Sequence, residues 1–128
     1  MSPAASAFVA VIDDNQQLRG LVVRALTGVG YRVKEWGNPE TAIEQLAQIS
    51  DEVALVVLDG VMPQMTGPRA ADRIFETHPH VPVLLMSGHE APMFEEFFGK
   101  PGHHFIAKPF VVEDFLARVG AIIGPPEK

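Results

Sequence analysis

Charged or hydroxyl-bearing side chains directly follow four short apolar runs of this chain. They are Asp13, Asp14, Asp59, Ser87 and Lys108. Three carboxylates that meet in one place repel one another and resist burial, so the arrangement is costly unless a cation neutralises it. Oxygen ligands with room for water suit Mg²⁺, and a lysine and a hydroxyl beside them can hold an incoming anion. Together these are the groups needed to receive a phosphoryl group.

The candidate nucleophile is one of the carboxylates, because a carboxylate can attack phosphorus and form an acyl phosphate. Asp59 is the best candidate, since it stands alone after the most apolar run, residues 53–58. Each residue taken singly is ordinary: an Asp after a strand is often a turn former or a helix cap, and Ser87-Gly88 is a common turn. Four runs that end in mutually complementary groups favour a shared site.

The segments that must position these side chains alternate between apolar runs and amphipathic stretches. Runs rich in β-branched residues predict buried strands, and apolar residues at helical spacing predict helices between them. The predicted strands are residues 8–12, 32–36, 53–58, 81–86 and 104–107, and the predicted helices are 16–29, a helix starting at Asn38-Pro39, 67–77, 91–98 and 113–123. This alternation predicts an α/β fold, a doubly wound parallel sheet with helices on both faces. Ligands bind such sheets beyond the carboxyl ends of the strands, where the candidate site would lie.

Length and composition set the class of protein. With 128 residues, of which 47% are hydrophobic and 20% charged, the sequence predicts a single domain over 1–128, with its core at about 8–123 and flexible tails at 1–7 and 124–128. The formal net charge of -6 argues against nucleic-acid or anionic-membrane binding. The absence of cysteine excludes a disulfide framework and a Cys nucleophile. With no membrane span or signal peptide in the sequence, we expect a cytoplasmic protein.

The residues at the ends of the apolar runs resemble the motifs of the response-regulator receiver domains of two-component signalling. The resemblance spans about Phe8 to Ile123 and rests on Asp13-Asp14, Leu58-Asp59 with Met62-Pro63 and Gly67 after it, Ser87-Gly88, and Lys108-Pro109-Phe110. It implies the flavodoxin-like (βα)5 fold with strand order 2-1-3-4-5. It also implies a cis peptide bond between Lys108 and Pro109. A receiver is a signalling switch rather than an enzyme, and it either stands alone or belongs to a larger protein such as a hybrid histidine kinase.

The resemblance implies that the carboxylates share a metal ion. Asp59 would accept a phosphoryl group from a phosphohistidine of a histidine kinase or a phosphotransfer protein. Mg²⁺, which Mn²⁺ can replace, would bind Asp14, Asp59 and the backbone carbonyl of Val61, with Asp13 acting partly through water.

The resemblance also implies roles for residues around the phosphoryl group. Ser87 would hydrogen-bond a phosphoryl oxygen, and Lys108 would pair with it. Phe105 would turn inward when Ser87 moves, which would switch a surface formed by the fourth helix, fifth strand and fifth helix for an effector or a homodimer. Val61 and His89 would tune the lifetime of the phosphorylated state.

Two alternative functions stay open. A phosphohydrolase of the haloacid dehalogenase type also places Asp, Ser or Thr, and Lys at strand ends, but it needs a second Asp two residues after its nucleophile, where this chain has Val61. A pseudo-receiver, which binds partners without being phosphorylated, is opposed by the presence of Asp14, Asp59, Ser87 and Lys108.

Two further expectations concern side chains away from the site. Phe75 is expected to face inward from its helix. Four histidines are expected to be surface residues, because nothing pairs them at the spacing of a zinc site. They are His78, His80, His103 and His104.

Overall fold

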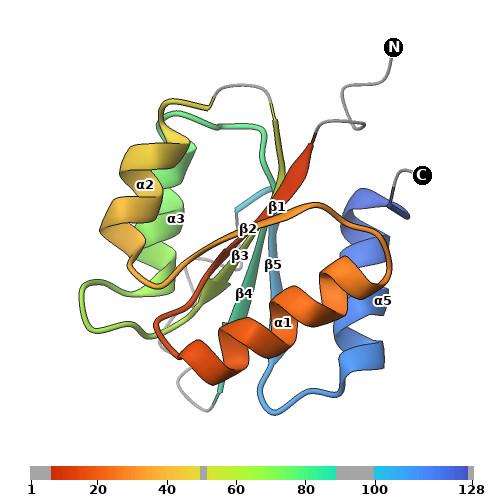
Figure 1. Ribbon diagram of the computed structural model, residues 1–128. Coiled ribbons are helices and arrows are strands. Elements are labelled where there is room, and N and C mark those ends of the chain that lie inside the picture. Colours follow the sequence, from red (N-terminus) through yellow and green to blue (C-terminus); the bar gives the residue numbers. More distant parts are fainter. Residues whose placement is uncertain (1–6, 50–51, 89–99, 127–128) are drawn as a thin grey trace.

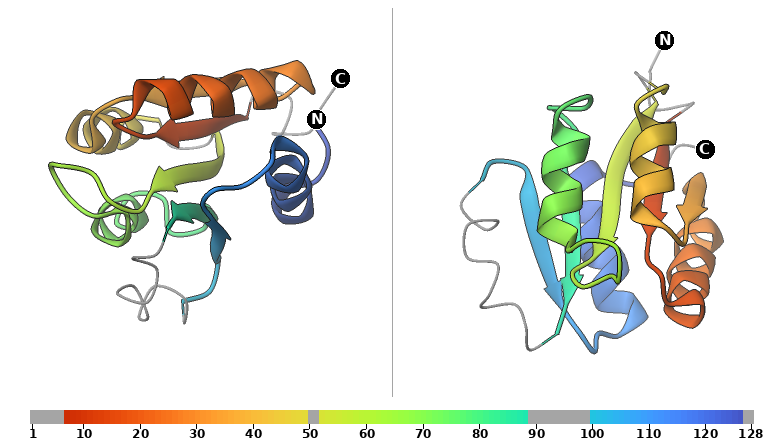
Figure 2. Two further views of the ribbon diagram at one scale, coloured as in Figure 1. Left: turned by 90° about the horizontal axis from the view of Figure 1, so that it is seen from below. Right: turned by 90° about the vertical axis from the view of Figure 1, so that its left-hand side faces the viewer.

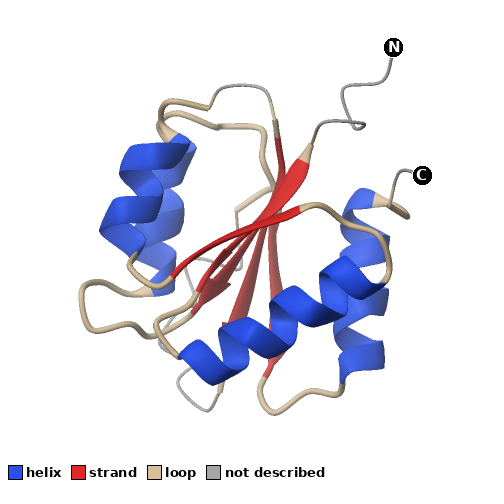
Figure 3. Cartoon of the chain, viewed as in Figure 1, coloured by secondary structure: helices blue, strands red, loops and turns tan. Residues whose placement is uncertain are grey.

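The computed structural model describes residues 7–49, 52–88 and 100–126 (Figure 1). Strands and helices alternate along these parts of the chain, as the hydrophobic pattern predicts (Figure 3). The strands are β1 (Phe8–Ile12), β2 (Val33–Trp36), β3 (Val53–Asp59), β4 (Val83–Ser87) and β5 (His103–Ala107), and the helices are α1 (Gln16–Gly28), α2 (Pro39–Leu46), α3 (Gly67–Phe75) and α5 (Val112–Ile123). The helix predicted at 91–98 lies outside the described residues.

The strands form one parallel sheet in the order β2-β1-β3-β4-β5, which confirms the predicted order and fold class. The winding direction reverses between β1 and β3, because β2 lies on one side of β1 while β3, β4 and β5 follow on the other. Side chains at the carboxyl ends of β1 and β3 therefore come side by side, with Ile12 opposite Leu58 in the register. This is the point in an open α/β sheet where ligands bind.

Two apolar cores cover the two faces of the sheet (Figure 2). On one face, α2 and α3 pack through residues such as Leu46 and Ile74 against alternate strand residues such as Ile12. On the other, α1 and α5 pack through Leu26 and Phe115 against the intervening ones. Because both faces are covered, the central strands are apolar throughout rather than alternating.

Side chains cap three of the described helices that start at the carboxyl edge of the sheet, α1, α2 and α3, whereas α5 has no side-chain cap. The Asn15 side-chain oxygen accepts a hydrogen bond from the backbone N–H of Leu18 at 3.0 Å, and the Asn38 oxygen accepts one from Glu40 at 2.8 Å. Thr66 caps α3 in the same way. These caps fix where the three helices begin, and α1 and α3 begin directly after the loops that carry Asp14 and Val61.

Two side-chain predictions are wrong. Phe75 is 58% exposed, because Ala71 and Ile74 take the sheet-facing side of α3 and the next residue turns outward. His78 is buried, because its ring hydrogen-bonds to the Thr77 hydroxyl and to the backbone carbonyl of Ile49. A buried backbone carbonyl needs a hydrogen-bond donor, and a histidine ring can supply one inside the fold. The spacing of apolar residues in the sequence does not reveal such a pairing.

Two further features of the described residues bear on the sequence analysis. The peptide bond between Lys108 and Pro109 is cis, as the resemblance implies. None of the described helices combines the length and the apolar character that crossing a membrane requires.

Candidate functional site

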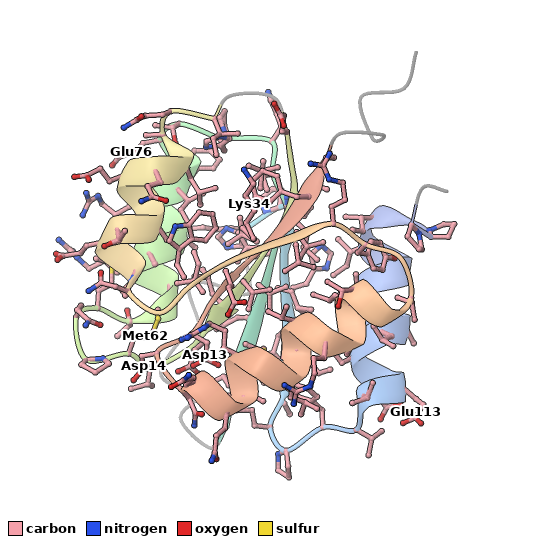
Figure 4. All side chains as sticks on the ribbon, viewed as in Figure 1. Asp13, Asp14, Lys34, Met62, Glu76 and Glu113 are labelled. Atoms are coloured by element: carbon pink, nitrogen blue, oxygen red, sulfur yellow. The ribbon has the colours of Figure 1, made fainter. Side chains whose placement is uncertain are left out.

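Three carboxylates meet at the carboxyl edge of the sheet. Asp13 and Asp14 follow β1, and Asp59 ends β3, its neighbour in the sheet. One carboxylate oxygen from each lies within 4.8 Å of the others. Figure 4 shows Asp13 and Asp14 where β1 leads into α1. Asp13 and Asp59 are buried and Asp14 is exposed, so the cluster opens to solvent on the side of Asp14.

Asp13 is held at three of its four polar groups. Its backbone N–H donates to the Trp36 carbonyl at 3.1 Å, its Oδ1 accepts from the Asn15 N–H at 2.9 Å, and its own carbonyl accepts from Arg19 Nη1 at 2.8 Å. Oδ2 is buried without a hydrogen-bond partner, the only such side-chain atom among the described residues. Burial raises the pKa of the Asp13 carboxyl to about 6; the Asn15 hydrogen bond opposes this shift, and the negative charge of Asp59 adds to it.

An unpartnered buried carboxylate oxygen beside two further carboxylates is an arrangement that a bound cation would stabilise. The donor set consists of oxygens alone, and Asp14 leaves one side open to water. Hard divalent cations prefer such ligands, and Mg²⁺ in particular keeps several of its waters. The residues present therefore fit a metal ion of this kind.

Asp59 is paired with Lys108, which follows β5. Lys108 Nζ lies 2.5 Å from Asp59 Oδ1, and both side chains are largely covered. The backbone N–H of Lys108 donates to the Ser87 carbonyl at 2.8 Å, which ties the loop after β5 to the end of β4. A partly buried ion pair of this kind holds the carboxylate and the ammonium in fixed positions. The pairing engages one Asp59 oxygen.

The loop after Asp59 is closed by Gly67. The Gly67 N–H donates to the Gly60 carbonyl at 2.8 Å, and residues Val61 and Thr66 form an antiparallel bridge. A Cβ atom at position 67 would lie 2.5 Å from the Asp59 carbonyl oxygen and 2.4 Å from a methyl group of Leu85. Only glycine allows this approach, and the loop that carries Asp59 is packed against the start of α3 as a result.

A cavity of about 750 Å³ opens beside Asp59 and Lys108. The rest of its lining is mostly apolar: Leu18, Leu21, Val61, Gly88, Pro109 and Phe110. Val61 itself is 52% exposed, so its side chain borders the opening rather than the core. The ion pair therefore sits in a recess whose walls offer few groups that could bind or orient a water molecule.

The remaining predicted residues lie on neighbouring strands or outside the described part. Ser87 is buried at the end of β4, the strand next to Asp59. Phe105 is half-buried in β5, in register with Leu85, and its backbone carbonyl accepts a hydrogen bond from Arg118. His89 lies outside the described residues. The structure thus brings Asp13, Asp14, Asp59 and Lys108 together and places Ser87 at the adjacent strand end.

Sequence reasoning missed Arg19, whose guanidinium reaches back from α1 to the Asp13 carbonyl. Arg19 lies in the first turn of α1, six residues after Asp13, but a lone arginine on a helix gives no signal of its own. Gly37, which lies against the same guanidinium, was missed because a glycine directly after a strand indicates no more than a turn.

Comparison with known proteins gives one consistent family. A family model described as the response regulator receiver domain matches residues 9–120. The sensor kinase CckA of Brucella abortus is 32% identical over 115 residues, which cover 89% of this chain and 12% of that protein. The regulatory protein DctD of Rhizobium meliloti is 33% identical over 115 residues, which cover 88% of this chain and 24% of that protein. The chain thus spans a quarter or less of the length of these two relatives.

Solved structures show the same fold. The receiver domain of NtrX from Brucella abortus superposes with a TM-score of 0.80 at 24% identity, covering 90% of this chain and 97% of that one. The receiver domain of the hybrid histidine kinase CckA superposes with a TM-score of 0.78 at 21% identity, covering 91% and 99%. Because the sequence identities are below 25%, these superpositions are evidence for the fold alone.

Proposed function

The chain belongs to the response regulator receiver domain family of two-component systems, and we propose that it works by accepting a phosphoryl group on Asp59. One observation carries the proposal: the Asp59 carboxylate is held at 2.5 Å by Lys108 and lies within 4.8 Å of two other carboxylates, at the ligand-binding edge of the sheet. Receiver domains are signalling domains, so the expected chemistry is the gain and loss of this group.

The transfer is a displacement at phosphorus. The Asp59 oxygen that Lys108 does not hold forms a bond to phosphorus, the bond from phosphorus to the donor's imidazole nitrogen breaks, and that nitrogen keeps the electron pair. The product is an acyl phosphate on Asp59. Asp14, Asp59 and the Val61 carbonyl would hold Mg²⁺ or Mn²⁺, with Asp13 Oδ2 acting partly through water. When bound, the ion neutralises charge that gathers on the carboxylates and the phosphoryl oxygens.

Lys108 and Ser87 bind the oxygens of the phosphoryl group once it is on Asp59. Lys108 exchanges its carboxylate partner for a phosphoryl oxygen, and its ion pair with Asp59 already holds the ammonium at that place. The Ser87 hydroxyl hydrogen-bonds a second oxygen, and Phe105 moves inward to fill the space that Ser87 leaves. The change alters the surface of β5 and α5, where we place contacts with an effector or a second copy of the chain.

The phosphoryl donor is a phosphohistidine on a histidine kinase or a phosphotransfer protein. Support comes from the relatives, which include a sensor kinase and transcriptional regulators. The net charge of -6 opposes a direct role in nucleic-acid binding, and we place the domain in the cytoplasm. A phosphohydrolase is disfavoured because Val61 stands where that chemistry needs a general acid.

The test is phosphorylation by a small donor. Wild-type protein incubated with acetyl phosphate and Mg²⁺ should gain one phosphoryl mass by intact mass spectrometry, and Asp59→Asn should gain none. Asp72→Asn is the matched control, because Asp72 is an exposed carboxylate paired with Lys100 at 2.8 Å, away from the site. Modification that persists in Asp59→Asn would contradict the assignment of the acceptor. A wild-type protein that gains no mass would instead favour the pseudo-receiver.

A further inference from the structure

We propose that Arg19 is a positioning residue for the phosphoacceptor site: its guanidinium sets the orientation of the peptide unit between Asp13 and Asp14 and so places both carboxylates. The proposal rests on the function proposed above. Arg19 touches neither the acceptor nor the expected metal position. It acts through the backbone of Asp13.

The guanidinium of Arg19 links three elements. Nη1 donates to the Asp13 carbonyl at 2.8 Å, and Nε donates to Glu35 Oε1 of β2 at 2.9 Å. The Arg19 side chain is 18% exposed and that of Glu35 is 46% exposed, so the bond to the Asp13 carbonyl is the better shielded of the two. A planar guanidinium with two directed bonds has a fixed orientation, which a single bond would not give.

The Asp13 carbonyl is a sensitive point at which to hold this loop. That carbonyl belongs to the planar peptide unit joining Asp13 to Asp14, so holding it restrains the backbone from which both side chains project. The Asp13 N–H and Oδ1 are bound by Trp36 and Asn15, so the Arg19 bond completes the set and leaves Oδ2 as the one unpartnered oxygen. Asn15 therefore holds the carboxylate, and Arg19 holds the backbone that aims its free oxygen into the carboxylate cluster.

Gly37 makes room for the guanidinium. A Cβ atom at this position would lie 2.8 Å from Arg19 Nη1, with no backbone atom in the way. Because the obstructed atom is the end of a flexible side chain, alanine at 37 would displace the guanidinium rather than the sheet. Gly37→Ala therefore disturbs the Arg19–Asp13 bond without changing any charge.

A purely electrostatic role for Arg19 predicts the opposite result. If the guanidinium only contributed a positive charge near the carboxylates, its removal would strengthen Mg²⁺ binding, because the site would become more negative. If it positions Asp13 and Asp14, its removal weakens binding, because the oxygens no longer converge. The sign of the change separates the two roles.

The experiment measures Mg²⁺ affinity and phosphorylation in four variants. Affinity is taken from the rise in melting temperature with Mg²⁺ concentration and from the fluorescence of Trp36, the only tryptophan, whose carbonyl binds the Asp13 N–H. Arg19→Ala should weaken Mg²⁺ binding about tenfold, the usual size of effect for residues that orient metal ligands. Gly37→Ala should weaken it in the same direction, and Arg19→Lys should not restore it, since an ammonium lacks the guanidinium fork.

Arg24→Ala is the matched control, because Arg24 is an exposed arginine on the same helix. Its Mg²⁺ affinity should stay within about twofold of wild type, the range expected for an exposed charge. Unchanged or tighter Mg²⁺ binding in both Arg19→Ala and Gly37→Ala would overturn the positioning role while leaving the phosphoacceptor assignment intact. If the wild-type protein neither binds Mg²⁺ nor gains a phosphoryl group, the proposed function fails, and this proposal fails with it.

Discussion

Asp13 and His78 are both buried polar residues, yet they lie at opposite edges of the sheet and are partnered differently. Figure 1 shows that the β1–α1 connection, which carries Asp13, and the α3–β4 connection, which carries His78, lie at opposite ends of the strands. Both ring nitrogens of His78 have partners, the Thr77 hydroxyl at 2.9 Å and the Ile49 carbonyl. Asp13, by contrast, has one buried carboxylate oxygen, Oδ2, without a hydrogen-bond partner.

The difference separates a structural residue from a candidate ligand. A buried polar group whose hydrogen bonds are all made stabilises the fold around it, and the His78 ring joins the loop after α2 to the end of α3. A buried carboxylate with an unpartnered oxygen destabilises the unliganded fold, and such groups mark functional sites. Burial alone would not have distinguished the two residues.

The largest effect on stability is expected from His78→Ala. The change leaves a cavity and removes the partner of the Ile49 carbonyl, so the free energy of unfolding should fall by about 2–4 kcal/mol. Mg²⁺ affinity should stay unchanged, because the residue lies at the other edge of the sheet. Urea denaturation with and without Mg²⁺ measures both quantities. His80→Ala, at an exposed residue two positions on, should change stability by less than about 0.5 kcal/mol; an equal loss in the two variants would remove the contrast.

Asp13→Asn should have the reverse pattern, with a gain in metal-free stability and a loss of Mg²⁺ affinity. The amide keeps an oxygen to accept from Asn15 and replaces the unpartnered oxygen by a donor that faces carboxylates. With EDTA present, the variant should be more stable than wild type by about 2–3 kcal/mol, the value of a carboxyl pKa held two units high. Mg²⁺ binding should weaken by at least about tenfold. Calorimetric unfolding in EDTA measures the change in stability. A less stable Asp13→Asn protein would show that the buried carboxylate does not destabilise the metal-free fold.

The stability gain of Asp13→Asn should also depend on pH, which is a smaller effect with a definite sign. The folded pKa of Asp13 is about 6, against 3.8 for the unperturbed group, so the folded state binds more protons between these values. Without metal, the contribution of Asp13 to stability therefore falls as pH rises from about 4 to about 6 and is constant above. The stability advantage of Asp13→Asn should be about 1 kcal/mol smaller at pH 5 than at pH 7.5. An advantage that grows toward low pH would contradict the raised pKa.

The sequence predicted most of the fold because each signal was local. Unbroken apolar runs such as 53–58 indicate strands covered on both faces, and Asn38-Pro39 indicates a helix start; both elements are found, with β3 one residue longer at Asp59. The carboxylate cluster was predictable too, because parallel strands bring their carboxyl ends to one edge of the sheet.

What the sequence did not reveal depends on contacts between distant segments. The buried ring of His78 hydrogen-bonds to a backbone carbonyl 29 residues away in the sequence, and the Arg19 side chain of α1 is held by Glu35 of β2. Gly67 matched the family motif, but its role, the close approach of α3 to the Asp59 carbonyl, needs the packed structure. Hydrophobic periodicity carries no information about which polar groups find each other, so these residues were missed or misplaced.

The smallest expected effect concerns the wall of the cavity beside Asp59. Loss of the phosphoryl group needs a water in line with phosphorus, opposite the departing Asp59 oxygen. Val61 borders this opening, is 52% exposed and offers no hydrogen bond. It adjoins the acceptor on a loop closed by the bridge between Val61 and Thr66, so it cannot move aside as a long side chain can. The proposed phosphorylated state should therefore be protected from water on this side.

Val61→Asn should shorten the half-life of that state, because its amide can hold a water molecule near phosphorus. One such hydrogen bond contributes about 0.5–1.5 kcal/mol, which corresponds to about 2- to 10-fold in rate. Following the decay of the phosphorylated mass after the donor is removed measures the effect. Val29→Asn is the matched control, since Val29 is exposed at the end of α1 and does not line the cavity. His89→Ala should change the half-life less than Val61→Asn. A half-life in Val61→Asn equal to that of Val29→Asn would mean that water reaches phosphorus from elsewhere.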